Sequence, residues 1–248
     1  RMVYSPLDAL RIARENPARE VVFLSVGFET TVPAECIALQ KAEEEQIPNF
    51  SLLVANKTMP MAYRALKGSA DAFLYPGHVC AITGTGECKK LVEEGFSGVV
   101  AGFTLIELLT ALLAIVKGCQ KDTPFFLNCY PRVVQDEGNP RALAMISQTM
   151  DACDTEWRGL GTIPGSGLRL KEQYANRDAF LRFAIPALES HANKACRCGE
   201  ILQGKCLPKD CKVFGKGCTP EHPIGACMVS SEGTCAAYYQ YGGDVHGH

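Results

Sequence analysis

The sequence lacks a long hydrophobic run and a strong net charge. Its most apolar window, FTLIELLTALLAIV at residues 103–116, contains Glu107 and is shorter than the roughly 18 residues that a membrane-spanning helix needs. The 25 Lys and Arg residues nearly balance the 27 Asp and Glu residues, giving a net charge of -2 without a basic stripe or an acidic tail. Fields of one sign steer proteins to nucleic acids and anionic lipids. We therefore expect no membrane and no nucleic acid as a partner.

Several motifs of common enzyme classes are also missing. The chain contains no GxGxxG or GxxxxGK(S/T) phosphate-binding loop, because GTGE at residues 84–87 is too short to count. It contains no GxSxG nucleophile turn either, although Ser166 lies between two glycines. Nucleotide binding and serine-hydrolase chemistry are therefore not expected. No secretory leader can be read at the start of the sequence, which favours a cytoplasmic protein.

What is present is the composition of a globular protein, with 248 residues, 47% of them hydrophobic and 21% charged. Segments of strand and helix character alternate: EVVFLSVGF, NFSLLVAN and SGVVAGF have the pattern of buried strands, with helical patterns between them. This alternation favours a mostly parallel sheet covered by helices. We predict α/β lobes over residues 1–150, a Gly-rich and helical connecting segment over 151–190, irregular around WRGLGTIPGSGLRL, and a cysteine-rich module over 191–248.

Two short motifs follow predicted strands. GFETT at residues 27–31 and PGHV at residues 76–79 each lie where a strand ends, and ligands of open α/β sheets bind at that edge. Glu29, Thr30 and Thr31 could bind a polar ligand there, and His78 could act as an acid, a base or a ligand. A simple helix cap and a structural loop histidine would give the same pattern, so the residues alone leave both interpretations open.

Cysteine is concentrated at one end of the chain. Of 13 cysteines, seven fall within the 40 residues from 196 to 235. These seven are Cys196, Cys198, Cys206, Cys211, Cys218, Cys227 and Cys235. In a chain long enough to build a core, such clustering indicates metal ligation, redox exchange or both. Four thiolates can hold a [4Fe–4S] cluster or a zinc ion. No two of the seven form a C-x2-C knuckle, which favours the cluster over zinc, and the surplus thiols allow a redox pair beside it.

Several longer stretches resemble the HypD family of [NiFe]-hydrogenase maturation factors. The resemblance rests on GFETT, PGHV, DEGNPRAL and WRGLGTIPGSGLRL, and above all on CRCGEILQG and FGKGCTPEHPIGACMVSSEGTCAAYYQYG in the cysteine-rich region. It runs from residue 1 to about residue 242. It implies an α/β fold of Rossmann-like or thioredoxin-like parallel-sheet lobes, followed by a small C-terminal iron–sulfur module.

The family carries its [4Fe–4S] cluster on cysteines spaced C-x14-C-x6-C-x16-C. The residues that match this spacing are Cys196, Cys211, Cys218 and Cys235. A register that begins at Cys198 shares the other three ligands, so the resemblance leaves the first ligand open. In the first register, Cys198 and Cys227 correspond to the family's redox-active pair, and Cys206 is left over.

The resemblance also implies a function. Together with the small partner HypC, members of the family hold an iron ion while cyanide and carbon monoxide are attached to it. The cyanide comes from the HypE–HypF pair, and the Fe(CN)2CO unit then passes to the hydrogenase large subunit. The chain is accordingly expected to be a scaffold and redox accessory protein. Its cleft residues Glu29, Thr30, Thr31 and His78 would lie where HypC and the cyanide donor dock.

Two motifs of the family do not occur in the chain. The iron-binding Cys-Gly-Thr-His motif and a Cys-Pro-Val-Cys redox motif lie, in the family, upstream of the segment that matches Arg1. We therefore expect a fragment or a truncated relative, which would not assemble the Fe(CN)2CO unit alone. Two alternatives remain. One is a zinc-stabilised α/β binding module without a redox role, and the other is a thiol-disulfide oxidoreductase, which would want a C-x-x-C that the chain lacks.

Overall fold

The computed structural model describes residues 1–186 and 193–242. Its contacts divide the chain into two compact units. The first contains residues 1–65, 71–155 and 164–186, and the second contains residues 66–70, 156–163 and the region from 187 onward. The predicted start of the cysteine-rich module, residue 191, lies outside the described residues.

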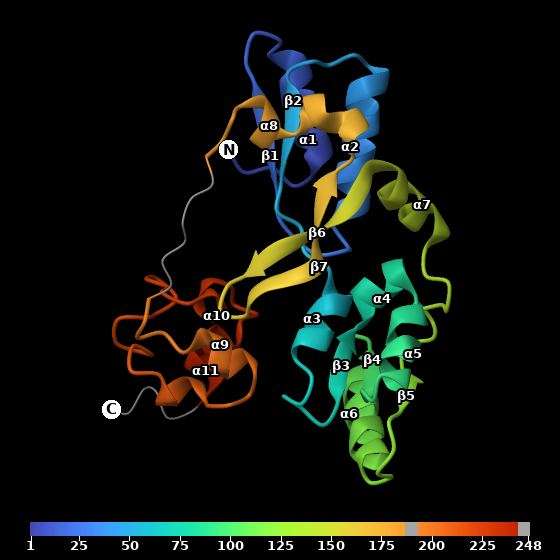
Figure 1. Ribbon diagram of the computed structural model, residues 1–248, viewed down its shortest axis with the longest axis vertical. Helices are drawn as coiled ribbons and strands as arrows, with labels where there is room; N and C mark the ends of the chain where they lie inside the picture. Colours follow the sequence, from blue (N-terminus) through green and yellow to red (C-terminus); the bar gives the residue numbers. More distant parts are fainter. Residues whose placement is uncertain (187–192, 243–248) are drawn as a thin grey trace. The chain divides into compact units, whose positions relative to one another are not determined.

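The first lobe of unit 1 is a two-stranded parallel sheet with helices packed against it (Figure 1, blue). Its elements are α1 Pro6–Glu15, β1 Val21–Ser25, α2 Val32–Glu44 and β2 Phe50–Val54. Val21 lies opposite Phe50 and Ser25 opposite Val54. The Ser5 hydroxyl caps α1 by accepting a hydrogen bond from the Asp8 N–H at 3.3 Å. The core of this lobe is mostly aliphatic, with residues of α1, α2 and β2 buried together around one fully buried aromatic side chain, Phe50.

The second lobe of unit 1 is a three-stranded parallel sheet in the order β3-β4-β5 (Figure 1, teal to green). Its elements are α3 Met59–Ala65, β3 Phe73–Pro76, α4 Gly77–Thr83, α5 Gly86–Glu93, β4 Gly98–Ala101, α6 Leu105–Cys119 and β5 Phe126–Asn128. The alternation of strands and helices and the parallel pairing confirm the predicted α/β fold with parallel-sheet lobes.

The most apolar stretch of the sequence forms α6. Thr104 and Glu107 make a capping box at its first turn, which explains the carboxylate that interrupts the apolar run. Arg132 also donates to the Glu107 carboxylate, at 2.8 Å. Among residues 1–186 and 193–242, no helix is long and apolar enough to cross a membrane.

The segment after β5 is more regular than predicted. It contains α7 Pro140–Thr149, β6 Met150–Trp157, β7 Gly161–Leu170, the 3-10 helix η1 Glu172–Arg177 and α8 Ala179–Arg182. The stretch expected to be irregular, residues 157–170, contains the end of β6, the turn after it and all of β7, which pairs with β6. Most of the glycines that suggested irregularity are part of β7 instead. Gly161 and Gly165 adopt φ of +80° and +63°, which allows the strand to bend. The helical part of the predicted connecting segment consists of two short pieces, because Asp178 is extended between η1 and α8, and η1 itself contains a non-helical residue, Tyr174.

Unit 2 has little regular structure of its own. Its helices are short: α9 Cys198–Leu202, the 3-10 helix η2 Pro208–Asp210, α10 Ala226–Val229 and α11 Thr234–Tyr241. Loops of up to about fifteen residues connect them. Six of the seven cysteines lie at or near the ends of these short elements, and Cys218 lies in the middle of the loop between η2 and α10. Packing of side chains between loops, rather than secondary structure, therefore holds this region together.

Candidate functional site

The GFETT motif lies where predicted, between the carboxyl end of β1 and the start of α2. Gly27 is required there, because a Cβ at this position would lie 2.4 Å from the Thr31 Oγ1. Thr31 is exposed and its hydroxyl donates to the Phe28 carbonyl at 3.1 Å. Thr30 is half-buried, whereas Glu29 is buried. The two threonines thus lie at the surface of the sheet edge and the carboxylate beneath it.

A buried polar network supports this edge, and the sequence analysis missed it. The Ser25 hydroxyl donates to Asn56 Oδ1 at 2.6 Å, and Asn56 Nδ2 donates to Thr31 Oγ1 at 3.2 Å and to Glu35 Oε1 at 3.3 Å. Burial raises the pKa of Glu35. Asn56 is only 1% exposed and follows β2 as GFETT follows β1. The sequence signal for this network is a polar residue after the neighbouring parallel strand, because the carboxyl ends of parallel strands lie at the same sheet edge.

Glu29 and His78 are placed differently from one another. Glu29 Oε1 accepts a hydrogen bond from the Met59 N–H at the start of α3, at 2.8 Å, and burial raises the Glu29 pKa. His78 is the second residue of α4, directly after β3, and it is exposed with its ring 5.1 Å from that of Phe103. Both residues lie at carboxyl ends of parallel strands, as the sequence analysis expected, but they belong to different sheets.

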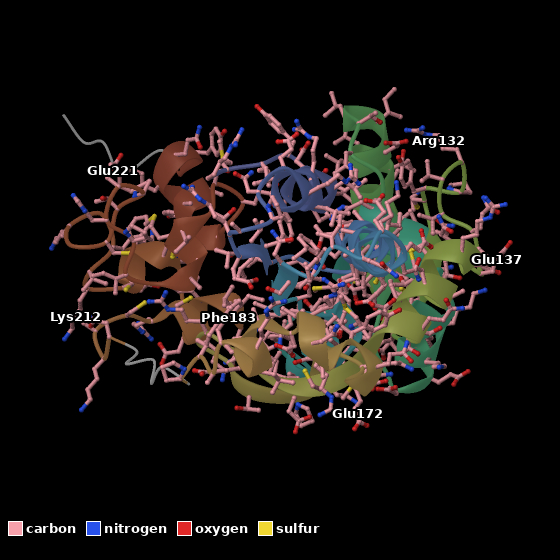
Figure 2. The ribbon with its side chains drawn as sticks, turned by 90° about the horizontal axis from the view of Figure 1, so that it is seen from above. Arg132, Glu137, Glu172, Phe183, Lys212 and Glu221 are labelled. Carbon is pink, nitrogen blue, oxygen red and sulfur yellow. The ribbon has the colours of Figure 1, made fainter. Side chains whose placement is uncertain are left out.

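The core of unit 2 consists largely of sulfur. Eight residues form its buried cluster, and five of them are cysteines. These five are Cys198, Cys211, Cys218, Cys227 and Cys235, with only Ile201, Met228 and Ala236 besides them. Cys196 and Cys206 are partly buried against the same cluster. Figure 2 shows the yellow sulfur atoms inside this region, whereas the labelled Lys212 and Glu221 point outward from its edge.

The thiols contact one another within this cluster. The Cys227 thiol donates to Cys235 Sγ at 3.1 Å, and Cys198 is hydrogen-bonded to Cys227. Cys196 interacts electrostatically with Cys198, Cys211 and Cys218. The described cysteines are all free thiols, without a disulfide among them. Six sulfurs from distant turns of the chain thus converge in one small core.

These contacts favour protonated thiols in the metal-free protein. The hydrogen bond to Cys227 and then burial raise the pKa of Cys198. The bond with Cys198 lowers the pKa of Cys227, but the bond to Cys235 and burial outweigh it and raise that pKa to about 11. Backbone N–H groups at the start of α10 also point at the Cys198 sulfur. Any metal that binds here must therefore displace protons, which makes binding tighter at higher pH.

The cysteine core of unit 2 suits an iron–sulfur cluster better than a single metal ion. Across residues 1–186 and 193–242, no group of three or more His, Cys, Asp or Glu side chains is close enough to hold a single metal ion. The donor set nevertheless suits an iron–sulfur cluster, which places its own iron and sulfide atoms between the thiolates and so holds them farther apart than one ion does. The backbone N–H of Ile224, 3.3 Å from Cys218 Sγ, is a donor of the kind that stabilises cluster ligands.

Because Gly225 has no side chain, Cys196 and Cys198 can pack close to its backbone. A Cβ at Gly225 would lie 2.7 Å from Cys196 Sγ and 3.3 Å from Cys198 Cβ, although the backbone there, with φ of -96°, is open to any residue. We expect Gly225→Ala to destabilise unit 2 by about 1–3 kcal/mol through overpacking. Thermal unfolding checks this, with Gly217→Ala as the matched control, because a Cβ at Gly217 meets only Ile224 Cδ1 at 3.9 Å. Equal losses in both variants would contradict this role for Gly225.

The two glycine-containing stretches WRGLG and CRCG meet within unit 2. A Cβ at Gly199, the second residue of α9, would lie 2.0 Å from the Gly159 carbonyl oxygen. Gly159 itself adopts a φ of +88° in the turn between β6 and β7. The Arg158 guanidinium donates to the Ile224 carbonyl beside the cysteines. The turn therefore packs its backbone directly on the helix that begins at Cys198.

The comparisons agree on one family. Residues 1–242 match the family model described as HypD, "Hydrogenase formation hypA family". The chain is 43% identical to hydrogenase maturation factor HypD2 of Bradyrhizobium diazoefficiens and 44% identical to HypD of Rhodobacter capsulatus, with 98% of the chain and 67% of each relative covered. It is 42% identical to HypD of Escherichia coli, with 97% of the chain and 66% of that protein covered. The chain therefore belongs to the HypD family of hydrogenase maturation factors.

Proposed function

We propose that unit 2 carries a [4Fe–4S] cluster and that the protein acts in hydrogenase maturation as a scaffold and redox partner. The observation that carries the proposal is the sulfur-rich core. Five of the eight residues in the buried cluster of unit 2 are cysteines, so the apolar core that the region can build without a metal centre is small. A metal centre supplies folding free energy in such cases.

Cys196, Cys211, Cys218 and Cys235 are the proposed ligands. The interactions favour Cys196 over Cys198 as the first of them, because Cys196 interacts electrostatically with Cys211 and Cys218 whereas the Cys198 thiol is hydrogen-bonded to Cys227. A bound cluster would supply one electron at a time.

Cys198 and Cys227 are the proposed redox pair beside the cluster. Their direct hydrogen bond satisfies the need of thiol exchange for a second sulfur within reach. Cys227 also contacts Cys235, so the pair adjoins a proposed ligand. These residues would hold and release two protons when the pair is oxidised, and the neighbouring ligand gives electrons a short path.

The proposal also covers the partners of hydrogenase maturation and places the protein in a reducing cytoplasm. The chain spans about two thirds of the length of the curated relatives it matches. Within the complete protein, Glu29, Thr30, Thr31 and His78 would form the cleft where HypC and the HypE–HypF cyanide donor dock. The Fe(CN)2CO unit would be assembled there as cargo for the hydrogenase large subunit. The exposure of Thr31 and His78 at strand ends supports this placement.

Alanine at Thr30 or His78 tests the cleft. In a complete family member that carries this region, we expect Thr30→Ala and His78→Ala each to lower hydrogenase maturation, measured as hydrogenase activity in cells that lack their own HypD. Both side chains are at least partly exposed, so neither change should reduce the amount of folded protein. The exposed Gln135→Ala, whose side chain donates only to the Pro131 carbonyl, is the control. Unchanged maturation would remove both residues from the site.

A further inference from the structure

A second group of cysteines lies outside unit 2, around a small cavity in unit 1. The cavity has a volume of about 20 Å³, and α3, α4, α5 and β3 enclose it. Among the residues that line it are Glu29, Tyr63, Tyr75, Cys80 and Cys88. A cavity of this size holds one molecule about as large as water.

The two thiols of the cavity are held against each other. Cys80 lies in α4 and is 3% exposed, Cys88 lies in the first turn of α5 and is 5% exposed, and their side chains are hydrogen-bonded. Gly84 makes the turn between the two helices with φ of +76°, and a Cβ there would lie 2.2 Å from the Asp136 carbonyl oxygen. A rigid turn therefore fixes the approach of the two sulfurs.

The two thiols differ in their pKa. The hydrogen bond from Cys80 lowers the pKa of Cys88, and the same bond raises the pKa of Cys80. The Cys88 sulfur also accepts from its own backbone N–H at the start of the helix, where a thiolate is favoured. Cys88 is thus the more acidic thiol of the pair, and Cys80 is the thiol that donates to it.

A proton acceptor lines the same cavity. Glu29 is 6% exposed, and its Oε1 accepts from the Met59 N–H while its Oε2 is buried without a hydrogen-bond partner among the described residues. The Tyr75 hydroxyl is likewise buried and without a partner there. Burial raises the pKa of Glu29, and a carboxylate with a raised pKa takes up a proton more readily.

We propose that Cys80 and Cys88 are a peroxide-sensitive redox site, which closes to a disulfide when a water-sized peroxide enters the cavity, with Glu29 as the proton acceptor. This site is independent of the cluster proposed for unit 2, although it shares Glu29 with the proposed docking cleft. The size of the cavity selects the oxidant, because hydrogen peroxide is close to water in size whereas a glutathione-type disulfide is many times larger.

The reaction proceeds in two steps. Cys88 gives its proton to Glu29, and its thiolate attacks one peroxide oxygen, so that an S–O bond forms, the O–O bond breaks and the released hydroxide regains the proton as water. Cys80 then gives its proton to Glu29, and its sulfur attacks the Cys88 sulfur. The S–S bond forms, the S–O bond breaks and a second water leaves. Two electrons pass from the two thiols to one peroxide molecule.

Tryptic peptides allow a direct test in the whole chain. Trypsin releases residues 68–89 as one peptide whose only cysteines are Cys80 and Cys88, and residues 20–41 as another whose only cysteine is Cys36. Cys36 is the matched control, because it is 0% exposed and has a pKa raised by burial to about 11. The protein is treated with hydrogen peroxide, unfolded, alkylated and analysed by mass spectrometry.

We expect peptide 68–89 to lose two hydrogens and take up no alkylating label, while Cys36 is fully labelled. Reduction with dithiothreitol should restore two labels. Full labelling of Cys80 and Cys88 at peroxide doses that oxidise other cysteines of the chain would overturn the proposal. Oxidation of both to sulfinic acids without a disulfide would overturn it as well.

Two variants separate the roles within the site. In Cys80→Ser, the second step is blocked, so Cys88 should accumulate as a sulfenic acid that dimedone labels; no labelling would refute Cys88 as the attacking thiol. Glu29→Gln should slow disulfide formation roughly tenfold or more in a variant that still unfolds cooperatively. An unchanged rate in Glu29→Gln would remove Glu29 from the proposal.

Discussion

Cys211→Ser is expected to reduce the iron and the acid-labile sulfide bound by the anaerobically purified chain to background. Cys211 is 7% exposed and belongs to the buried sulfur cluster, and a serine hydroxyl is a much weaker ligand than a thiolate for the irons of a cluster. Because the remaining core of unit 2 is small, the variant should also lose protease resistance in this unit. Iron and sulfide analysis with limited proteolysis measures both effects.

Cys206→Ser is the matched control for this prediction. Cys206 belongs to the same unit, is only partly buried, and its thiol donates to the Glu200 carboxylate at 3.9 Å. Its replacement should leave iron and sulfide unchanged. If Cys206→Ser loses as much iron as Cys211→Ser, the proposed ligand set is wrong.

Arg177→Ala is expected to destabilise unit 1 by about 3 kcal/mol or more. Arg177 is 4% exposed and reaches from η1 across to the end of α2 and the start of β2. Its guanidinium donates to Glu43 at 2.5 Å and to the carbonyls of Ala42, Ile47 and Phe50. Removing it leaves three buried carbonyls without this donor, and each such loss costs about 1–3 kcal/mol. Urea unfolding followed by circular dichroism measures the change.

Arg182→Ala provides the comparison. Arg182 donates to the Pro48 carbonyl and to Glu20, both at 2.6 Å, but a quarter of its side chain is exposed and water can replace these bonds. We expect a loss of about 1 kcal/mol or less for it. Arg177→Lys should lie nearer to Arg177→Ala than to the wild type, because an ammonium cannot make the fork of bonds. Similar stabilities of Arg177→Ala and Arg182→Ala would contradict the role given to Arg177.

The sequence was most informative where local pattern determines structure. Helices and strands alternate through the first 128 residues, and the Ser5-Pro6 start of α1 follows from capping chemistry alone. The same reasoning failed at WRGLGTIPGSGLRL, because glycine indicates conformational freedom without saying whether a strand uses it. The resemblance to the family came from long specific stretches, and the comparisons confirm it.

Contacts between distant segments could not be read from the sequence. Asn56 and Glu35 join Ser25 in one buried network only because parallel pairing brings β1 and β2 side by side. The thiol pair of Cys80 and Cys88 was not predicted, since their spacing matches no motif and only the turn at Gly84 brings them together. The roles of the C-terminal cysteines remain predictions, which the convergence of their sulfurs supports.

Elemental analysis of the wild-type chain, purified without oxygen, tests the central claim most directly. Iron and acid-labile sulfide should be present in equal amounts, with four of each per chain, in a brown protein. A colourless protein that holds zinc and no sulfide would contradict the account. It would make unit 2 a zinc-stabilised module without a redox role.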